Sequence, residues 1–372
     1  MSLRVIYEEK AIDQAAGFLA DDPAGLGAVL DAVGRLAGDP RPAESFPYGS
    51  PDLRRLRVGR YRVTYEIKGD EVEQRCSTAV PCGTGAQPVA APSRRLAISC
   101  YMDSGLPICK TCGVQYGGPR ADCPICLDER QYVGWDGQQW TTLAELRAAG
   151  HRGRVQQEGP GVVGIGAAPP TAIGQRALLV RTPGGNVLWD MITYIDDDVL
   201  AEVRELGGVS AIAVSHPHFY GSMIEWAHAL DAPVYIHAKD RRWVARPDDA
   251  VVFWDGDARE IGDGVTLVNA GVHFDGGQVL HWAAAQDGAG ALFSGDIFTV
   301  VPDRRWVSFM YSYPNHIPER PRTIRRALDL IEPLRFDRVY GAWWQRIVHS
   351  DGAAAIRRSA ERYLSFALDD NR

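Results

Sequence analysis

Cysteine is absent after Cys126 from this chain of 372 residues, because all seven cysteines fall between Cys76 and Cys126. A network of disulfides spread over the chain is thereby excluded, and one local sulfur site is indicated. The chain also lacks an apolar run of about 18 residues, and its N-terminus lacks the basic and apolar regions of a signal peptide. We therefore expect a cytoplasmic protein without a membrane span.

Positive charge is not in excess, since 40 Lys and Arg face 47 Asp and Glu, for a formal net charge of −7. The whole molecule has no electrostatic reason to bind a polyanion, so any nucleic-acid site must be local. Hydrophobic residues make up 45% and charged residues 23%, which excludes the disordered class. The length predicts two or three domains, and no repeat of fixed period is present.

Composition and periodicity divide the chain into five parts. Residues 1–75 have the order helix, helix, strand, strand, and residues 76–104 contain an uncharged stretch rich in Gly, Pro and Ala, as in a flexible linker. Residues 105–130 hold a cysteine cluster, and residues 131–155 resemble a connecting segment with a short helix. Residues 156–372 alternate strand-like runs with helical patterns, which indicates an α/β domain.

Four cysteines form two C-x-x-C pairs separated by ten residues: Cys109, Cys112, Cys123 and Cys126. In such knuckles the two thiolates face one ion while the following turn directs backbone N–H groups at the sulfurs. The form C-x-x-C-G-x-x-Y followed by C-P-x-C resembles rubredoxin-like and zinc-ribbon domains. The resemblance implies a bound Zn or Fe, of which structural Zn is favoured. The remaining cysteines, in or beside the linker, are predicted to be free thiols.

Histidine and aspartate follow several strand-like runs of the last part. His216 and His218 leave one run, His273 follows another, Asp296 follows a third, and Asp190 ends an earlier one. Two histidines at positions i and i+2 at a strand end can both face one ion. Since the site of an α/β fold lies at one edge of its sheets, we expect these side chains to converge.

This ordered set resembles the metallo-β-lactamase fold, an αββα sandwich whose members share H-x-H-x-D-H, a later G-H, a later G-D and a final G-H. The resemblance spans about Gly161 to Leu368. It implies that His216, His218 and His273 are the three histidine ligands of the first metal site. It also implies that Asp296 is the acidic ligand that bridges both metals in two-metal members.

The chain departs from that family pattern at three positions. Tyr220 and Gly221 stand where the family has Asp and His, and Ala342 stands where it has the last His. We therefore predict at most one ion here, Zn, Fe or Mn. Held by three histidines and a carboxylate, such an ion keeps an open position, lowers the pKa of bound water to about 7 and polarises a carbonyl or phosphoryl oxygen. Asp190, Asp275 and Tyr220 are candidates to orient that water in place of the missing Asp.

An aromatic and arginine-rich stretch follows Asp296 and includes Arg304, Arg305 and Trp306. It suits the wall of a pocket for a substrate with an acidic group and a flat or apolar part. Alternatively, the aromatic side chains pack under the sheet and the arginines face solvent. Trp343, beside the place of the lost histidine, is expected to pack near the site and keep it dry.

The N-terminal part carries the pattern L-R-x-G-x-Y-R-x-x-Y and resembles the RelE/ParE toxin superfamily of small α+β domains, which cleave mRNA on the ribosome or poison gyrase. The resemblance implies RNA contact through Arg55 and Arg62, and an antitoxin-like partner. Alternatively, this arginine-rich strip is the solvated face of a sheet. After Val72 the chain runs into the linker, where the family continues into a strand with a catalytic Arg and Tyr.

The leading interpretation is a mononuclear metal-dependent hydrolase, in which metal-bound hydroxide attacks an ester, thioester, amide or phosphoester of a small molecule. One alternative is a redox or electron-transfer protein that uses a rubredoxin-like Fe site. Another is a toxin-derived RNA-binding protein whose sandwich domain is not catalytic. A fold hosts several chemistries, so the resemblance alone does not choose among them.

Overall fold

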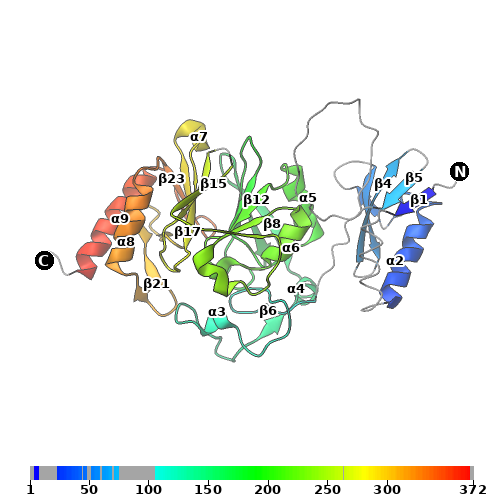
Figure 1. Ribbon diagram of the computed structural model, residues 1–372, viewed down its shortest axis with the longest axis horizontal. Coiled ribbons are helices and arrows are strands. Elements are labelled where there is room, and N and C mark those ends of the chain that lie inside the picture. The colour runs from blue at the N-terminus through cyan, green and yellow to red at the C-terminus, as the bar shows by residue number, and fades with distance from the viewer. Residues whose placement is uncertain are drawn as a thin grey trace. The chain divides into compact units, whose positions relative to one another are not determined.

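The computed structural model describes residues 4–7, 23–43, 45–47, 52–58, 61–68, 71–74, 105–262 and 264–368. The chain divides into two compact units, Met1–Ser104 and Gly105–Arg372 (Figure 1). None of the described helices joins the length and the apolar composition needed to cross a membrane.

The first unit contains a five-stranded sheet of order β1-β5-β4-β3-β2. Its described elements are β1 (Arg4–Tyr7), α2 (Pro23–Arg35), β2 (Ser45–Pro47), β3 (Leu53–Val58), β4 (Tyr61–Lys68) and β5 (Glu71–Gln74). Helix α2 packs Val29 and Val33 against the sheet, where Leu56, Val63 and Tyr65 are buried. An apolar stripe at helical spacing thus forms a small core with one face of the sheet.

The predicted helix before Gly38 is confirmed, but the part predicted to hold two strands contains three, because the alternating run from Leu56 to Ile67 is divided between β3 and β4. Strand β1 was not predicted, because a run of four residues is too short to show a period; it pairs in parallel with β5. The predicted first helix and the linker 76–104 lie outside the described residues, as do the side chains of Arg55 and Arg62. The RelE/ParE likeness therefore stays a prediction.

The second unit is built on two large sheets. The seven-stranded sheet has the order β14-β13-β12-β11-β10-β9-β8, and the six-stranded sheet has the order β15-β16-β17-β18-β23-β24. The strands of the first are β8 (Arg152–Gly159), β9 (Val162–Ala168), β10 (Ala177–Val180), β11 (Val187–Trp189), β12 (Ala211–Ala213), β13 (Val234–His237) and β14 (Val251–Trp254). The strands of the second are β15 (Ala258–Gly262), β16 (Val265–Asn269), β17 (Gln278–Trp282), β18 (Ala291–Gly295), β23 (Arg338–Gly341) and β24 (Ile347–Val348).

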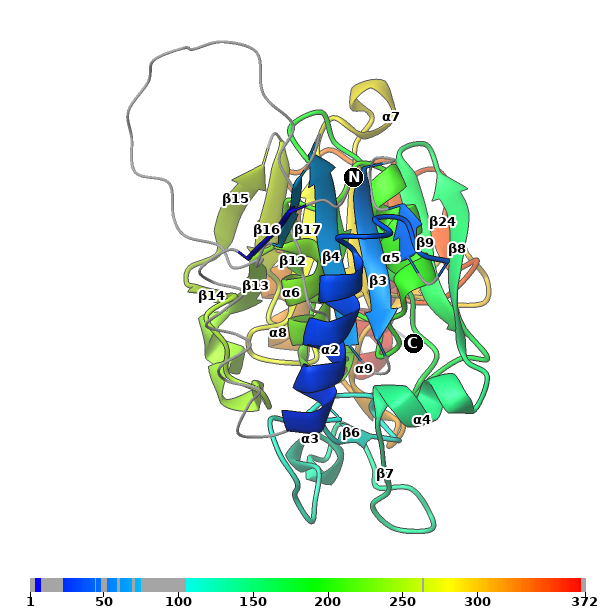
Figure 2. The same ribbon diagram turned by 90° about the vertical axis from the view of Figure 1, so that its right-hand side faces the viewer.

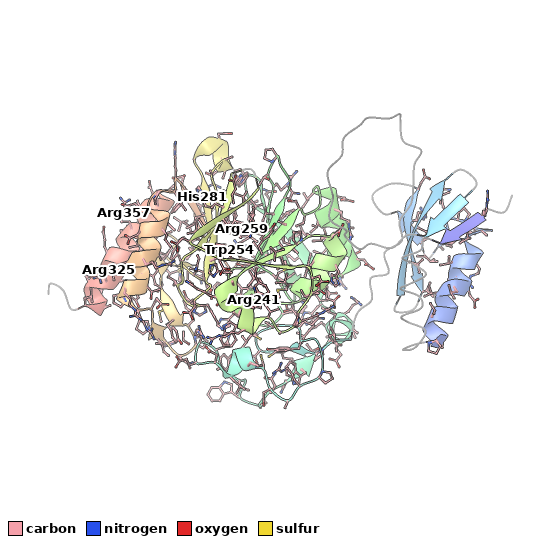
Figure 3. The ribbon with its side chains drawn as sticks, viewed as in Figure 1. Arg241, Trp254, Arg259, His281, Arg325 and Arg357 are labelled. Atoms are coloured by element: carbon pink, nitrogen blue, oxygen red, sulfur yellow. The ribbon has the colours of Figure 1, made fainter. Side chains whose placement is uncertain are left out.

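The two sheets pack face to face around a core that includes Trp189, Phe293 and Tyr340, with Trp254 between the sheets (Figure 3). Helices α5 (Asp197–Glu205) and α6 (Met223–Leu230) cover the seven-stranded sheet, and α8 (Pro321–Ile331) and α9 (Gly352–Ala367) cover the six-stranded sheet (Figure 1). A second core lies under α8 and α9, while Arg325 and Arg357 on these helices are exposed (Figure 3). The layers form an αββα sandwich, as the resemblance implied.

Short elements complete this unit. They are β6 (Ile108–Cys109), α3 (Pro124–Leu127), β7 (Trp140–Thr141), α4 (Leu143–Ala148), η1 (Pro217–Phe219), η2 (Ala238–Trp243), α7 (Ala285–Gly288), β19 (Thr299–Val300), β20 (Val307–Ser308), β21 (Met310–Ser312) and β22 (Ile317–Pro318). The elements α3 and β6, which contain cysteines, and β7, which pairs with β6, lie together at one end of the sandwich (Figure 2). They belong to the same compact unit as the two sheets.

The sequence predicts strands at eight apolar runs of the last part: 177–180, 187–190, 211–215, 233–237, 265–269, 279–282, 291–294 and 338–341. Each run contains a strand of the sandwich or lies within one. The first strand, β8, begins at Arg152, so the domain start predicted at residue 156 falls inside it. Strand β8 alternates exposed and half-buried residues and carries no apolar run. The segment 131–155 accordingly contributes β7, α4 and the start of β8 rather than a connection alone.

Candidate metal centres

Four cysteine sulfurs converge at one end of the second unit. The Sγ atoms of Cys109, Cys112, Cys123 and Cys126 are buried and lie within 4.8 Å of one another. Cys109 Sγ is 3.6 Å from Cys126 Sγ, and Cys112 Sγ is 3.7 Å from Cys123 Sγ. A disulfide would place two sulfurs about 2.05 Å apart, whereas thiolates about 2.3 Å from a tetrahedral Zn lie about 3.8 Å apart. Burial raises the pKa of the Cys112 thiol, so thiolates gathered here need the charge of a cation.

The first knuckle depends on Gly113. Its φ is +79°, and a Cβ at this position would lie 2.1 Å from Thr193 Oγ1, so only glycine fits. Thr193 Oγ1 donates a hydrogen bond to Gly113 O at 3.0 Å, which joins the knuckle to the loop after β11. Gln138 Nε2 donates to Cys109 Sγ at 3.3 Å and stabilises negative charge on that sulfur.

Three histidines from two loops form a second cluster. His216 follows β12, His218 lies in η1, and His273 lies between β16 and β17. One ring nitrogen of each lies within 4.8 Å of the others, and all three side chains are buried. His218 Nδ1 is 3.1 Å from His273 Nε2, near the roughly 3.3 Å expected between two nitrogens bound to one tetrahedral Zn.

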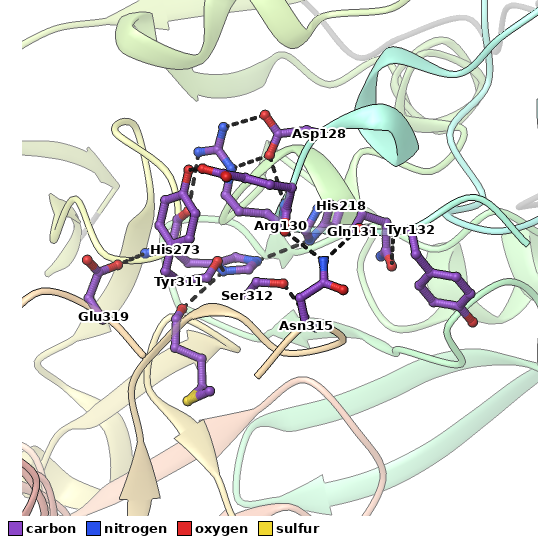
Figure 4. A network of polar contacts seen from close by, with 12 residues as sticks. Asp128, Arg130, Gln131, Tyr132, His218, His273, Tyr311, Ser312, Asn315 and Glu319 are labelled. Atoms are coloured by element: carbon purple, nitrogen blue, oxygen red, sulfur yellow. Dashed lines mark hydrogen bonds and ion pairs between the residues drawn. The ribbon is translucent and has the colours of Figure 1, made fainter. Parts of the chain in front are cut away.

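Neighbouring groups fix the orientation of two of these rings. Tyr311 O lies 2.8 Å from His273 Nδ1 (Figure 4). A carbonyl only accepts, so His273 Nδ1 carries the proton and its Nε2 presents a lone pair to the cluster. Ser215 Oγ lies 2.9 Å from His216 Nδ1, which leaves His216 Nε2 for the cluster. Glu319 Oε2 accepts from His273 N at 2.9 Å and holds a backbone whose φ is +68°.

Asp296 lies beside the histidines, with Oδ1 3.3 Å from His216 Nε2. Neither of these two buried atoms has a hydrogen-bond partner among the residues that the structure describes. An unpartnered buried polar atom costs about 1–3 kcal/mol, which a cation between the two atoms would offset. Three imidazoles and one carboxylate are a donor set suited to Zn, Fe or Mn, so the residues present fit such an ion.

Burial makes the three imidazoles ready ligands. It lowers the pKa of His273 to about 4, against the opposing effect of the hydrogen bonds to Met310 and Tyr311. It also lowers the pKa of His216 and of His218 well below the usual 6.5, and the other histidines add to this shift. All three are therefore neutral at pH 7, which is the form that binds a metal.

Asp190 follows β11 and contacts the residue before His216. Its Oδ1 accepts from Ser215 N at 2.7 Å. A Cβ on Gly295 would lie 2.9 Å from Asp190 Oδ2, so Gly295 leaves room for the carboxylate. Burial raises the pKa of Asp190 to about 7. Asp190 thus holds the residue before His216 in place, and its predicted catalytic role stays a prediction.

The three positions that depart from the family pattern are all tightly packed. Gly221 has a φ of +48°, and a Cβ there would lie 2.6 Å from Ile192 O, so no side chain fits. Ala342 is buried, and its carbonyl accepts from Arg176 N at 2.9 Å. Tyr220 is buried, and its Oη has no hydrogen-bond partner within the described part of the chain. Backbone therefore occupies the space that a further ligand at Gly221 would need.

The residues predicted to form the wall of a substrate pocket lie near helix α9. Arg304 and Arg305 are exposed, and Arg305 pairs with Asp303 at 2.8 Å. Trp306 lies under Arg362 of α9, whose guanidinium is 3.7 Å from the ring centroid. The contacts of these residues are with Asp303 and α9 rather than with the histidines, which favours the alternative of solvated arginines.

Trp343 lies closer to the histidine cluster. Its ring centroid is 6.1 Å from that of Phe219, which is itself 4.4 Å from that of His216. Trp343 Nε1 donates to Ile173 O at 3.0 Å, which fixes the indole. This position is compatible with the prediction that Trp343 excludes water from the site, and that role stays a prediction.

Besides Glu319, sequence reasoning missed the buried charged residues Arg130 and Asp240 near the cluster. Arg130 follows the cysteine knuckles, and its Nη1 donates to His273 O at 3.4 Å. Asp240 lies in η2, its Oδ1 accepts from Gly276 N at 3.0 Å, and its Oδ2 has no partner among the described residues. Arg130 is 5% and Asp240 is 2% exposed. No motif marks such residues, since their burial depends on segments that meet only in the fold.

The chain is similar to several known proteins. The sequence profile of the Metallo-beta-lactamase superfamily matches residues 170–343. The uncharacterized protein YmaE of Bacillus subtilis (strain 168) is 45% identical over 261 residues, which cover 69% of this chain and 95% of YmaE.

Among solved structures, a B3 metallo-β-lactamase with an active-site glutamic acid is 18% identical, with a TM-score of 0.41, over 59% of this chain and 92% of that chain. The metallo-β-lactamase FIM-1 from Pseudomonas aeruginosa, in its mono-zinc form, is 11% identical, with a TM-score of 0.44, over 59% of this chain and 97% of that chain. By its identity to YmaE the chain belongs to the same family as that uncharacterized protein, and its residues 170–343 match the Metallo-beta-lactamase superfamily.

Proposed function

We propose that this protein is a metal-dependent hydrolase of small molecules with one working ion. The observation that carries the proposal is the meeting of three buried, neutral imidazoles beside an unpartnered carboxylate oxygen of Asp296. When bound, a Zn, Fe or Mn ion polarises a carbonyl or phosphoryl oxygen and lowers the pKa of water. Esters, thioesters, amides and phosphoesters are the substrates that this chemistry suits.

The chain's own residues hold and orient the ligands. Tyr311 O keeps the proton of His273 on Nδ1, and Ser215 directs His216 Nε2 toward the cluster. Burial of the ligands excludes bulk water and strengthens each electrostatic interaction there. Asp190 and Tyr220 are the proposed groups for orienting a water or holding a proton, because each is buried with one oxygen free of hydrogen bonds to the described residues.

The proposal includes a single ion at the histidine cluster. Gly221 has no room for a side chain, and Ala342 has no ligand atom. The cysteine centre is proposed to hold a structural Zn, and Fe is the alternative. An Fe–thiolate centre absorbs visible light whereas a Zn–thiolate centre does not, so the colour of the purified protein separates the two.

Hydrolysis assays test the proposal. The purified chain is supplied with Zn, Fe(II) or Mn and a panel of chromogenic esters, thioesters, amides and phosphoesters. We expect turnover of at least one class, with loss of 100-fold or more in a His216→Ala, His218→Ala double variant. The control is His228→Ala, which removes a histidine paired with Asp248 at 3.0 Å on the surface. Equal activity of the double variant and the parent would contradict the proposal.

A further inference from the structure

We infer that Arg130, which lies in the cysteine segment (residues 105–130), is a positioning residue for the histidine metal centre. The inference rests on the proposed function only in taking His216, His218 and His273 as the metal ligands. The inference connects the two metal centres physically. Arg130 comes shortly after Cys126 of the cysteine centre, and it contacts His273 of the histidine centre.

Arg130 is anchored by the cysteine segment. Its Nε donates to Asp128 Oδ1 at 2.6 Å and its Nη2 donates to Asp128 Oδ2 at 2.9 Å. Asp128 is the C-cap of α3, the helix that contains Cys126 and begins after Cys123. A two-point pair of this kind fixes the plane of a guanidinium as well as its distance. The fold of the cysteine centre therefore determines where the Arg130 guanidinium lies.

The same guanidinium contacts three parts of the His273 environment. Its Nη1 donates to His273 O at 3.4 Å. Its Cζ lies 4.0 Å from the ring centroid of Phe274, the next residue along the chain. It also lies 5.3 Å from the ring centroid of Tyr311, whose carbonyl accepts the His273 Nδ1 proton. One side chain thus touches the ligand, its neighbour and its hydrogen-bond acceptor.

Contacts on both sides of Arg130 attach the segment to the same loop. Tyr311 Oη donates to Glu129 Oε1 at 2.6 Å. Asn315 Nδ2 donates to Glu129 O at 2.8 Å and to Gln131 O at 3.2 Å (Figure 4). The segment from Glu129 to Gln131 is therefore bonded along its length to the β21–β22 region that orients His273.

The backbone conformation of His273 requires support from neighbouring groups. Its φ of +68° lies in the left-handed region, which a non-glycine residue keeps only when its surroundings hold it. Glu319 holds the N–H of His273 and Arg130 holds its carbonyl. Groups that orient a metal-binding histidine contribute about 10- to 100-fold to metal affinity. Arg130 supplies this support without contacting the ion.

Zinc affinity of the full chain tests the inference. Arg130→Met keeps much of the apolar part of the side chain and removes the guanidinium. Arg130→Lys keeps the positive charge but cannot form the paired hydrogen bonds to both oxygens of Asp128. The control is Arg120→Met, which removes an exposed arginine of the same segment that stacks on Tyr116 at 4.6 Å. Competition with a chromophoric chelator measures the affinity of the weaker centre, and Co(II)–thiolate absorption reports the occupancy of the cysteine centre.

We expect Arg130→Met to keep the cysteine centre and to lower the zinc affinity of the histidine centre by about tenfold or more. Arg130→Lys should recover part of this loss, and Arg120→Met should match the parent. A histidine-centre affinity within twofold of the parent in Arg130→Met would overturn the inference. So would loss of both ions in Arg130→Met, or an equal loss in Arg120→Met, because the effect would then be one on folding. Since turnover is not measured, these outcomes are separate from failure of the proposed hydrolase.

Discussion

Gly221 shows how a single residue shapes the histidine centre. The family pattern has a metal-binding histidine here, whereas this chain has a backbone turn with a φ of +48°. We predict that Gly221→Ala lowers the free energy of unfolding by about 1–3 kcal/mol, because the conformation is left-handed and Ile192 O lies 2.6 Å from the new Cβ. Urea denaturation measures this. Gly118→Ala, with open space around the added Cβ, is the control and should change stability little.

Asp240 gives a prediction on pH. Burial raises its pKa from 3.8 to about 7, so between these values the folded protein binds a proton that the unfolded chain has lost. The contribution of this group to stability is complete below about pH 4 and falls as pH rises to 7. Asp240→Asn keeps the acceptor for Gly276 N and removes the charge. It should stabilise the protein at pH 8 by at most about 4 kcal/mol and change little at pH 4.

Thermal unfolding of the parent and Asp240→Asn at both pH values measures this difference. An equal change in stability at pH 4 and pH 8 would show that titration of Asp240 is not its cause.

Individual residues differ in how far the sequence predicts them. His216, His218 and His273 follow apolar strand runs, so their convergence could be predicted from order and spacing alone. Arg130 and Glu319 could not, because each reaches His273 from a segment distant in sequence. Their roles depend on docking, which no local pattern encodes.

At the scale of elements, the cysteine knuckles are part of the sandwich structure. Gln115 N donates to Gly221 O at 2.9 Å, and Thr193 Oγ1 donates to Gly113 O at 3.0 Å. The first knuckle thereby contacts both the loop after β11 and the loop that follows His218. We therefore expect a change at the cysteine centre to affect the backbone around the histidine centre.

We predict that Cys112→Ser removes one bound ion per chain and weakens metal binding at the histidine centre as well. The physical reason is that four buried sulfur ligands fold the knuckles only around a cation, and the knuckles hold Gly221 and Arg130. Elemental analysis and chelator competition measure both effects. Cys82→Ser, which changes a predicted free thiol, should leave both centres intact; equal losses in the two variants would contradict the prediction.

Two of the strands outside the eight predicted runs, β8 and β15, share a physical feature. Strands β8 and β15 alternate half-buried and exposed residues and carry charged side chains, so they show no continuous apolar run. The eight predicted strands are nearly all buried, and their apolar composition follows from burial on both faces. The sequence therefore predicts the interior of the sandwich better than its edges.

At the scale of the whole molecule, the histidine centre depends on both sheets. His216 and Asp190 follow strands of the seven-stranded sheet, and His273 and Asp296 follow strands of the six-stranded sheet. An ion bound between them joins the two halves of the sandwich. Metal binding to this centre and folding of residues 105–372 should therefore be thermodynamically linked.

This linkage predicts the effect of metal on stability. At free zinc about 100-fold above the dissociation constant of the histidine centre, the unfolding free energy should rise by about 2.7 kcal/mol. The His216→Ala, His218→Ala double variant retains the cysteine centre and should lack this increment. Denaturant titrations of both proteins over a series of buffered zinc concentrations measure it. An equal increment in the double variant would place the stabilising ion elsewhere.

Anomalous scattering at the zinc edge, from crystals of the zinc-loaded chain, tests the central claim most directly. The proposal expects two peaks per chain, one among the four cysteine sulfurs and one bounded by His216, His218 and His273 with Asp296 beside it. An empty histidine cluster in zinc-loaded crystals would contradict the proposed metal centre. Two peaks about 3.5–4 Å apart at that cluster would contradict the single working ion.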